Sequence, residues 1–258
     1  MIRTMSIGKL SFASLLFAAA SFAQCSPGSL VGAYGYTIDG TITDANNRLI
    51  TASQIGRIQF NGTGGYTGVS ISTVGGKADV SEFSGVIEVL SDCTAVGKTG
   101  TGAGATDFDL VVVDSGNGFA LVIRAGDATL SGGGSKIDNQ GSCSNSSLNG
   151  TYGYQGNGTV AVDGKGRSTA EIGILTFDGS GGMRGTYSFI AAGTAERKSF
   201  TGGVYALADV CYAAAAYKID GLDYELNIMV VGNGNQFLYQ EIAPGYVVSG
   251  VGSRTVSR

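Results

Sequence analysis

Hydrophobic and polar positions alternate along most of this chain. From Leu30 onward, Leu30, Tyr34 and Tyr36 share one face of an extended segment, while Val31 and Ala33 share the other. A period of two residues is typical of a β-strand, whose side chains point alternately to its two faces. We therefore predict a strand here, and comparable patterns predict further strands at Gln54–Asn61, Tyr66–Thr73, Glu82–Asp92, Asp107–Val113, Phe119–Arg124 and Ala128–Ser131.

Short glycine-rich segments separate the predicted strands. "NGTGG", "VGGKAD" and "DSGNG" punctuate the first half of the chain, and "DGSGG" and "VGNGN" punctuate the second. Asn, Asp and Gly tolerate the backbone conformations of tight turns. Seven or eight short antiparallel strands in each half, without a convincing amphipathic helix, indicate an all-β barrel or sandwich. A closed barrel is favoured because it leaves no exposed strand edge, and because strand glycines such as Gly32, Gly56 and Gly85 suit its bends.

The sequence contains the same domain twice. "CSPGSLVGAYGYTIDGT" from Cys25 matches "CSNSSLNGTYGYQGNGT" from Cys143 at an offset of 118 residues. A period of this length corresponds to a whole domain and not to a solenoid repeat. We predict two tandem antiparallel β-barrel domains, residues 24–138 and 139–258, joined within the polar segment Ser131–Ser142.

Four cysteines follow the same repeat. Cys93 lies 68 residues after Cys25, and Cys211 lies 68 residues after Cys143. Three pairings are possible, and the equal intervals favour Cys25–Cys93 and Cys143–Cys211, one bond in each domain. A metal or redox site is disfavoured because the chain has no CxxC motif and no histidine.

The N-terminal segment has the order of a secretory signal peptide. Basic Arg3 and Lys9 precede an apolar run from Leu10 to Ala20, which small residues follow. This order predicts a signal peptide over residues 1–23, with cleavage after Ala23. The apolar run is shorter than the roughly 20 residues that a membrane span requires. We therefore expect a secreted, extracellular or periplasmic protein with no membrane span.

Composition excludes several classes of function. Without Arg3 and Lys9, 14 basic residues remain against 20 acidic ones, which argues against a nucleic-acid partner. The absence of histidine excludes Ser-His-Asp, Cys-His and HExxH sites. We also expect no bound metal and no cofactor.

One polar pair is a candidate for chemistry inside the barrels. Glu171 shares a strand face with Gly173, Leu175 and Phe177, and its counterpart in the first repeat is Gln54. A buried carboxylate is costly unless it has a partner, so Glu171 can mark a ligand cavity and act as an acid or base. The alternative is that both side chains reach water at the rim of the barrel.

The repeated "YGY" motif is the second candidate. Tyr34 and Tyr36, and likewise Tyr152 and Tyr154, lie two residues apart and therefore share a face. Such tyrosines can line a ligand site with aromatic walls and hydroxyl donors. They can equally pack the core of a small barrel near the disulfide.

The repeat resembles sequences that occur elsewhere. The pattern C-x4-L-x-G-x-Y-x-Y, then FDG or FNG with a double glycine, then a strand ending in Cys, resembles tandem repeats of uncharacterised bacterial secreted proteins. Its rhythm of strands and turns resembles calycin-type barrels related to allene oxide cyclase. The resemblance implies an eight-stranded barrel and no particular activity.

Three functions follow as hypotheses. The first is a non-enzymatic binding or surface-interaction protein whose partner is a small hydrophobic molecule, a glycan or a surface protein. Its binding residues would be Tyr34, Tyr36, Tyr152, Tyr154, Gln54 and Glu171. The second is an isomerase or cyclase with Glu171 as acid or base, and the third is a structural component of an envelope or matrix.

Overall fold

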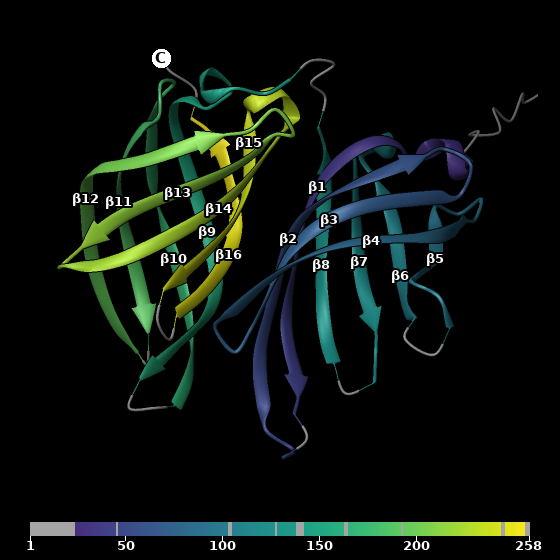
Figure 1. Cartoon of the computed structure of the whole chain (residues 1–258), viewed down its shortest axis with the longest axis horizontal. Helices are drawn as coiled ribbons and strands as arrows, with labels where there is room; N and C mark the ends of the chain where they lie inside the picture. The colour runs from purple at the N-terminus through teal and green to yellow at the C-terminus, as the bar shows by residue number, and fades with distance from the viewer. Residues whose placement is uncertain are drawn as a thin grey trace, which may run out of the picture.

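The computed structural model describes residues 24–44, 46–102, 105–126, 128–137, 142–162, 165–191, 193–243 and 246–255. The predicted signal peptide and the predicted boundary between residues 138 and 139 lie outside these segments. Figure 1 shows two barrels side by side, one from each half of the sequence.

Each barrel consists of eight antiparallel strands, and the prediction of two tandem all-β barrels is confirmed. Each strand pairs with the next one along the chain, and the last pairs with the first. The first barrel contains β1 (Val31–Thr43), β2 (Leu49–Asn61), β3 (Gly65–Val74), β4 (Lys77–Val89), β5 (Thr94–Thr99), β6 (Thr106–Val113), β7 (Gly118–Arg124) and β8 (Ala128–Lys136). The second contains β9 (Asn149–Val162), β10 (Lys165–Asp178), β11 (Gly182–Ala191), β12 (Thr194–Leu207), β13 (Tyr212–Ile219), β14 (Leu222–Val231), β15 (Gln236–Ala243) and β16 (Tyr246–Arg254).

The alternation along β1 and β2 decides which side chains fill the barrel. Tyr36 points inward and is buried, and it pairs across the sheet with Gly56, just as Tyr154 pairs with Gly173 in the second barrel. A Cβ atom at Gly56 would lie 2.9 Å from the ring of Tyr36, and one at Gly173 would lie 2.7 Å from the ring of Tyr154. The strand glycines therefore make room for the tyrosine rings.

Disulfides and short 3-10 turns close one end of each barrel. The bonds Cys25–Cys93 and Cys143–Cys211 are those predicted from the spacing. Each bond ties the segment before the first strand of its barrel to the turn between the fourth and fifth strands. The turns at this end are η1 (Pro27–Ser29) and η3 (Asp114–Gly116) in the first barrel, and η4 (Asn145–Ser147) and η5 (Gly232–Gly234) in the second.

The polar segment predicted to join the domains is partly a strand. Residues Ser131 to Lys136 belong to β8, so the predicted join is confined to the part of Ser131–Ser142 that follows Lys136. A Cβ atom at Gly132 would lie 1.9 Å from the carbonyl oxygen of Thr37. The glycines here mark close contact with the neighbouring strands and not a flexible connection.

The two barrels pack directly against each other, and we call this contact the barrel joint. It forms between the outer sides of β1 and β2 in the first barrel and of β14, β15 and β16 in the second. Ile55 from the first barrel and Met229, Val231 and Leu238 from the second form a buried apolar cluster there. Within the described segments, every strand pairing stays inside one barrel.

A short chain of hydrogen bonds accompanies the apolar cluster of the barrel joint. Gln240 Nε2 donates to Ser53 Oγ at 3.0 Å, and Ser53 Oγ donates to Asp39 Oδ1 at 2.9 Å. Ser249 also donates to Asp39. Burial raises the pKa of the Asp39 carboxyl, although these two hydroxyl donors act in the opposite direction. The joint is therefore a specific contact with partnered polar groups.

The two disulfides indicate an oxidising compartment, as found outside the cell or in a periplasm. No helix in the described segments is long and apolar enough to cross a bilayer.

Candidate functional site

The first barrel encloses a cavity of about 220 Å³. Its deep walls are the buried rings of Phe60, Phe108 and Phe119, whereas Ile123 is half-buried and Ser81 is exposed. The cavity therefore reaches from the closed core toward water. The full lining is Tyr36, Ile38, Gln54, Ile58, Phe60, Tyr66, Ser70, Ser81, Phe83, Thr99, Phe108, Leu110, Phe119, Leu121 and Ile123.

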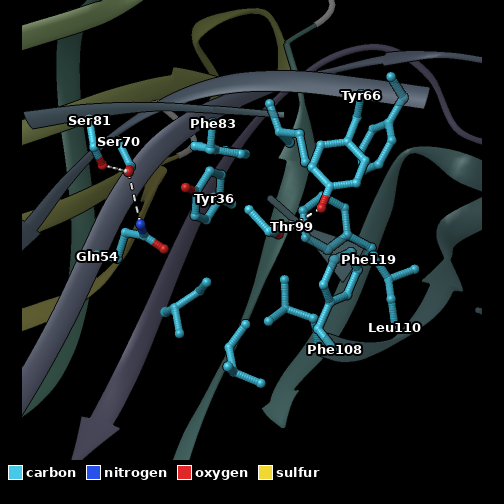
Figure 2. A pocket seen from close by; sticks show the side chains of 15 residues that line it. Tyr36, Gln54, Tyr66, Ser70, Ser81, Phe83, Thr99, Phe108, Leu110 and Phe119 are labelled. Atoms are coloured by element: carbon cyan, nitrogen blue, oxygen red, sulfur yellow. Dashed lines mark hydrogen bonds between the residues drawn. The ribbon is translucent and has the colours of Figure 1, made fainter. Parts of the chain in front are cut away.

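One side of the cavity carries a cluster of polar groups. Gln54 Nε2 donates hydrogen bonds to Ser70 Oγ at 2.8 Å and to Ser72 Oγ at 3.0 Å. The hydroxyls of Ser70 and Ser81 lie 3.4 Å apart, and the hydroxyl of Tyr36 also bonds with Ser70. We call Gln54, Ser70, Ser72 and Ser81 the polar corner, and Figure 2 shows Gln54, Ser70 and Ser81 to one side of the rings of Tyr36 and Phe83.

A second polar point lies among the aromatic side chains. The hydroxyl of Tyr66 and Oγ1 of Thr99 are 2.7 Å apart, and Figure 2 shows them near Phe108 and Phe119. Burial raises the pKa of the hydroxyls of Tyr36 and Tyr66, so both remain neutral at physiological pH. The cavity thus combines aromatic walls with neutral groups that donate or accept hydrogen bonds.

The second barrel carries larger side chains at three lining positions of this cavity and at two positions next to it. The repeat offset and the shared strand registers identify the equivalent residues. The second barrel replaces Ser70 by Tyr187, Ser72 by Phe189, Ser81 by Lys198, Thr99 by Tyr217 and Thr106 by Tyr224.

These larger side chains fill the second barrel with stacked rings. The ring of Tyr217 stacks on Phe200, with centroids 4.0 Å apart, and on Tyr224, with centroids 5.3 Å apart. Tyr224 in turn meets Tyr246 edge-on at 6.0 Å. The space that is open in the first barrel is therefore occupied by tyrosine and phenylalanine in the second.

Glu171 lies among these rings and does not reach water at the rim. Its side chain is 4% exposed, and it accepts hydrogen bonds from Tyr239 at 2.6 Å and from Tyr246 at 2.7 Å. Burial raises the pKa of Glu171, and the two hydroxyl donors offset only part of that shift. Of the two alternatives that the sequence left open, the rim position is wrong.

A second buried carboxyl group accompanies Glu171. Glu241 is 2% exposed and occupies the position of Ile123 in the first barrel. The hydroxyl of Tyr217 bonds to its carboxyl group, while Oε1 is buried without a hydrogen-bond partner. Burial, with the charge of Glu171 nearby, raises the pKa of Glu241 well above its ordinary value. The protonated form of Glu241 is therefore favoured more than that of an exposed glutamate.

A hollow of about 700 Å³ lies at the mouth of the second barrel. The side chains of Tyr187, Tyr224, Tyr246 and Lys198 line it, and Glu171 is not among its lining residues. The amine of Lys198 pairs there with Glu196 at 3.3 Å and with Asp220 at 3.2 Å. A molecule in this hollow would meet tyrosine rings before it met a buried carboxyl group.

The structure distributes the six predicted binding residues over three places. Tyr36 and Gln54 line the cavity of the first barrel. Tyr34 and Tyr152 are fully buried at the closed ends, where their hydroxyls donate to the carbonyl groups of Gly116 at 2.5 Å and Gly234 at 2.6 Å. Tyr154 and Glu171 lie in the filled second barrel, where the ring of Tyr154 meets that of Tyr239 at 5.4 Å.

Sequence reasoning missed several residues of both interiors. Ser70 and Thr99 shape the cavity, and Glu241 completes the buried carboxyl pair. Glu241 follows Phe237 and Tyr239 at intervals of two residues, so the strand pattern alone places it on their face. A residue-by-residue comparison of the two repeats would have identified Ser70, Thr99 and Glu241, because each differs from its counterpart in the other repeat. Among the described residues, no group of three or more His, Cys, Asp or Glu side chains is placed to hold a metal ion.

Comparisons with known proteins identify no family for this chain. No family model matches it, and no curated protein matches it. Among solved structures, a protein of Nitrosomonas europaea described as a candidate AttH is similar, with 9% identity and a TM-score of 0.29, over 86% of this chain and 92% of that one. A protein of unknown function from the DUF3598 family of Nostoc punctiforme has 11% identity and a TM-score of 0.21, over 88% of this chain and 97% of that one. Both similarities are too distant to support an argument about fold or function.

Proposed function

We propose that this is an exported, non-enzymatic binding protein whose first barrel holds a small, mainly apolar molecule. The ligand sits against the aromatic walls of the cavity and bonds to the polar corner around Gln54 and Ser70. The second barrel is a filled support for the first, joined to it through the barrel joint. Closed eight-stranded antiparallel barrels commonly carry a single small ligand in this way.

The difference between the two interiors is the observation that supports this proposal. Both barrels have the same order of eight strands and an equivalent disulfide, so the shared architecture alone does not require their interiors to differ. Thr99 nevertheless stands where the second barrel has the stacked ring of Tyr217. Protein interiors are ordinarily close-packed, so an open volume edged by hydrogen-bonding groups is typical of a binding site.

The volume limits the size of the ligand. An apolar cavity of about 150 Å³ accepts benzene in another protein, and small-molecule sites generally begin near about 300 Å³. A cavity of about 220 Å³ fits one ring with a short substituent or a short aliphatic chain. We expect one hydroxyl or carbonyl group on the ligand, because the polar corner offers neutral donors and acceptors.

A pair of probes that differ by one hydroxyl group tests the proposal. Phenol and toluene have nearly the same shape, and we expect both to bind, with phenol the tighter because it reaches the polar corner. Chemical-shift perturbation in NMR spectra locates the binding, and it should affect the methyl groups of Ile58 and Leu110. An absence of saturable binding by both probes would overturn the proposal.

A matched pair of variants separates a filled cavity from a damaged fold. Thr99→Tyr copies the residue of the second barrel into the cavity and should abolish binding of both probes. Val96→Tyr places the same side chain on the same strand at an outward position that is 42% exposed, and it should bind as the wild type does. Unchanged binding by a folded Thr99→Tyr variant would contradict a site in the first barrel.

Acid–base catalysis in the second barrel is the alternative that one observation favours. Glu171 and Glu241 are two buried carboxyl groups with raised pKa values, as sites of proton transfer often have. The rings that surround them leave the substrate no evident place beside Glu171. An isomerase or cyclase activity lost in Glu171→Gln and retained in Thr99→Tyr would favour this alternative over binding in the first barrel.

A further inference from the structure

The barrel joint uses different faces of the two barrels. We call the outer side of the first three strands of a barrel its leading face, and the outer side of the last three its trailing face. At the joint, Gly35 and Ile55 on the leading face of the first barrel meet Met229 and Val231 on the trailing face of the second. A Cβ atom at Gly35 would lie only 2.3 Å from Cγ of Met229, so the methionine occupies the space above the glycine.

Because the domain is duplicated, each barrel has one used face and one free face. The leading face of the second barrel lies on β9, β10 and β11. Thr159 on β9 reaches the barrel joint, where its hydroxyl lies 2.7 Å from that of Thr51, and we call the rest of this face the free leading face. Gly153 and Ile172 stand there at the positions of Gly35 and Ile55. Ile172 is 64% exposed, whereas Ile55 is 1% exposed. The space above Gly153 is open, with only a methyl carbon of Thr255 within 4 Å, at 3.9 Å.

The free leading face carries three exposed isoleucines beside polar side chains such as Thr186 and Ser188. Ile174 and Ile190 accompany Ile172 on it, and each is 50% exposed. In the register of the sheet, Ile190 pairs with Ala170, next to Ile172 on the same face of β10. A surface hollow runs from Gly153 to Ile172 and Ile174. Exposed isoleucines grouped around a hollow are typical of a surface that binds a partner.

The free trailing face belongs to the first barrel and carries exposed valines beside the ion pair of Arg124 and Asp109. Val111 and Val113 on β6 stand at the positions of Met229 and Val231, and Val122 on β7 stands at that of Gln240. These three valines are 43–47% exposed. In Figure 1, β6 lies on the side of the first barrel away from the second, and β11 lies on the side of the second barrel away from the first. The parts of the two free faces on β6 and β11 therefore lie away from the joint.

We infer that copies of this chain associate head to tail through these two faces. The free leading face of one copy receives the free trailing face of the next, and Val111 of that copy lies over Gly153 as Met229 lies over Gly35. The contact repeats the barrel joint between molecules. Because it joins two different faces, it extends into a chain or closes into a ring and does not stop at a symmetric dimer.

Sedimentation velocity of the exported chain over a wide concentration range tests self-association. We expect the weight-average mass to rise with concentration beyond that of a dimer. Ile172→Asp and Val122→Asp each place a carboxylate in the contact, and each should weaken association at least about tenfold. Both positions are exposed in the single copy, so the melting temperature of the dilute protein serves as the control for folding. A wild-type chain that remains monomeric at every concentration would overturn the inference, and so would association that neither variant weakens.

Engineered cysteines test the geometry. The Cβ position of Gly35 lies 3.3 Å from Cβ of Met229, close to the separation that a disulfide requires. A chain with Gly153→Cys and Val111→Cys should therefore form a ladder of disulfide-linked multimers on a non-reducing gel. The matched control combines Gly153→Cys with Val86→Cys, an outward position on β4 that is 63% exposed. Equal ladders from both chains would contradict the proposed contact. The test is independent of ligand binding, because neither free face lines the cavity of the first barrel.

Discussion

The hydroxyl of Tyr246 lies 2.7 Å from Oε2 of Glu171 and donates a hydrogen bond to it inside the second barrel. In the first barrel the equivalent of Glu171 is Gln54, which donates to the serines of the polar corner instead. The same strand position thus holds an acceptor among tyrosine donors in one barrel and an amide donor in the other. The two interiors have diverged in both shape and chemistry.

The raised pKa of Glu241, one of the two buried carboxyl groups, predicts how the stability of the folded protein depends on pH. The pKa of Glu241 is raised well above 4.5 in the folded protein, so the folded state holds a proton that the unfolded chain releases as pH rises. The contribution of Glu241 to the unfolding free energy should therefore be greatest below about pH 4.5 and should decrease as pH rises. For one proton the decrease is at most about 1.4 kcal/mol per pH unit. Urea unfolding at a series of pH values between 5 and 8 measures this slope.

Two variants assign the slope to Glu241. Glu241→Gln removes the titrating group, so its unfolding free energy should vary less with pH than that of the wild type. Glu225→Gln changes an exposed side chain on the neighbouring strand β14 and serves as the control. A wild-type slope that survives in Glu241→Gln would show that this carboxyl group ionises normally.

Much of the architecture could be predicted from the sequence, for identifiable reasons. The alternation of apolar and polar residues reports which side of a strand is buried, and tight turns require Asn, Asp and Gly. The equal spacing of Cys25–Cys93 and Cys143–Cys211 predicts the pairing because a duplicated domain keeps its own bond. These signals are local, or they repeat at a fixed offset.

The open cavity and the barrel joint could not be predicted in this way. Alternation places Thr99 and Tyr217 on an inward face, but the volume left between eight strands depends on all their side chains together. Similarly, Ile55 lies on an outward face, which the strand pattern alone assigns to the surface. Only the three-dimensional arrangement shows that Met229 covers this face.

The first tyrosine of each YGY motif should stabilise the closed end of its barrel. Tyr34→Phe removes the donor to the buried carbonyl group of Gly116 and should cost about 1 kcal/mol or more of unfolding free energy. Tyr152→Phe leaves the carbonyl oxygen of Gly234 with a second donor, Arg254 at 3.0 Å, but it removes the hydroxyl to which Arg254 donates at 2.8 Å, so we expect a loss of similar size. Chemical denaturation measures both values, and binding of phenol should remain unchanged in both. Unchanged unfolding free energy in both variants would refute this assignment.

Two equivalent glycines should respond in opposite ways to the same substitution. Gly35→Ala places a methyl group 2.3 Å from Cγ of Met229 and 2.8 Å from Cγ1 of Val231, so these side chains or the barrels themselves must shift. We expect a loss of about 1–3 kcal/mol of unfolding free energy, as for other overpacked contacts. Gly153→Ala meets no atom closer than 3.9 Å and should be neutral or stabilise by about 0.4–1 kcal/mol, because alanine restricts the unfolded chain more than glycine does.

A double-mutant cycle connects the loss in Gly35→Ala to the barrel joint. Met229→Ala removes the atoms that the new methyl group would meet, so Gly35→Ala should cost less in that background than in the wild type. The coupling should exceed about 0.5 kcal/mol, the usual level for residues in contact. Calorimetry on the dilute protein keeps self-association out of the measurement. Additive costs would mean that the two residues do not touch in solution, and the barrel joint and the head-to-tail contact that repeats it would both lose their support.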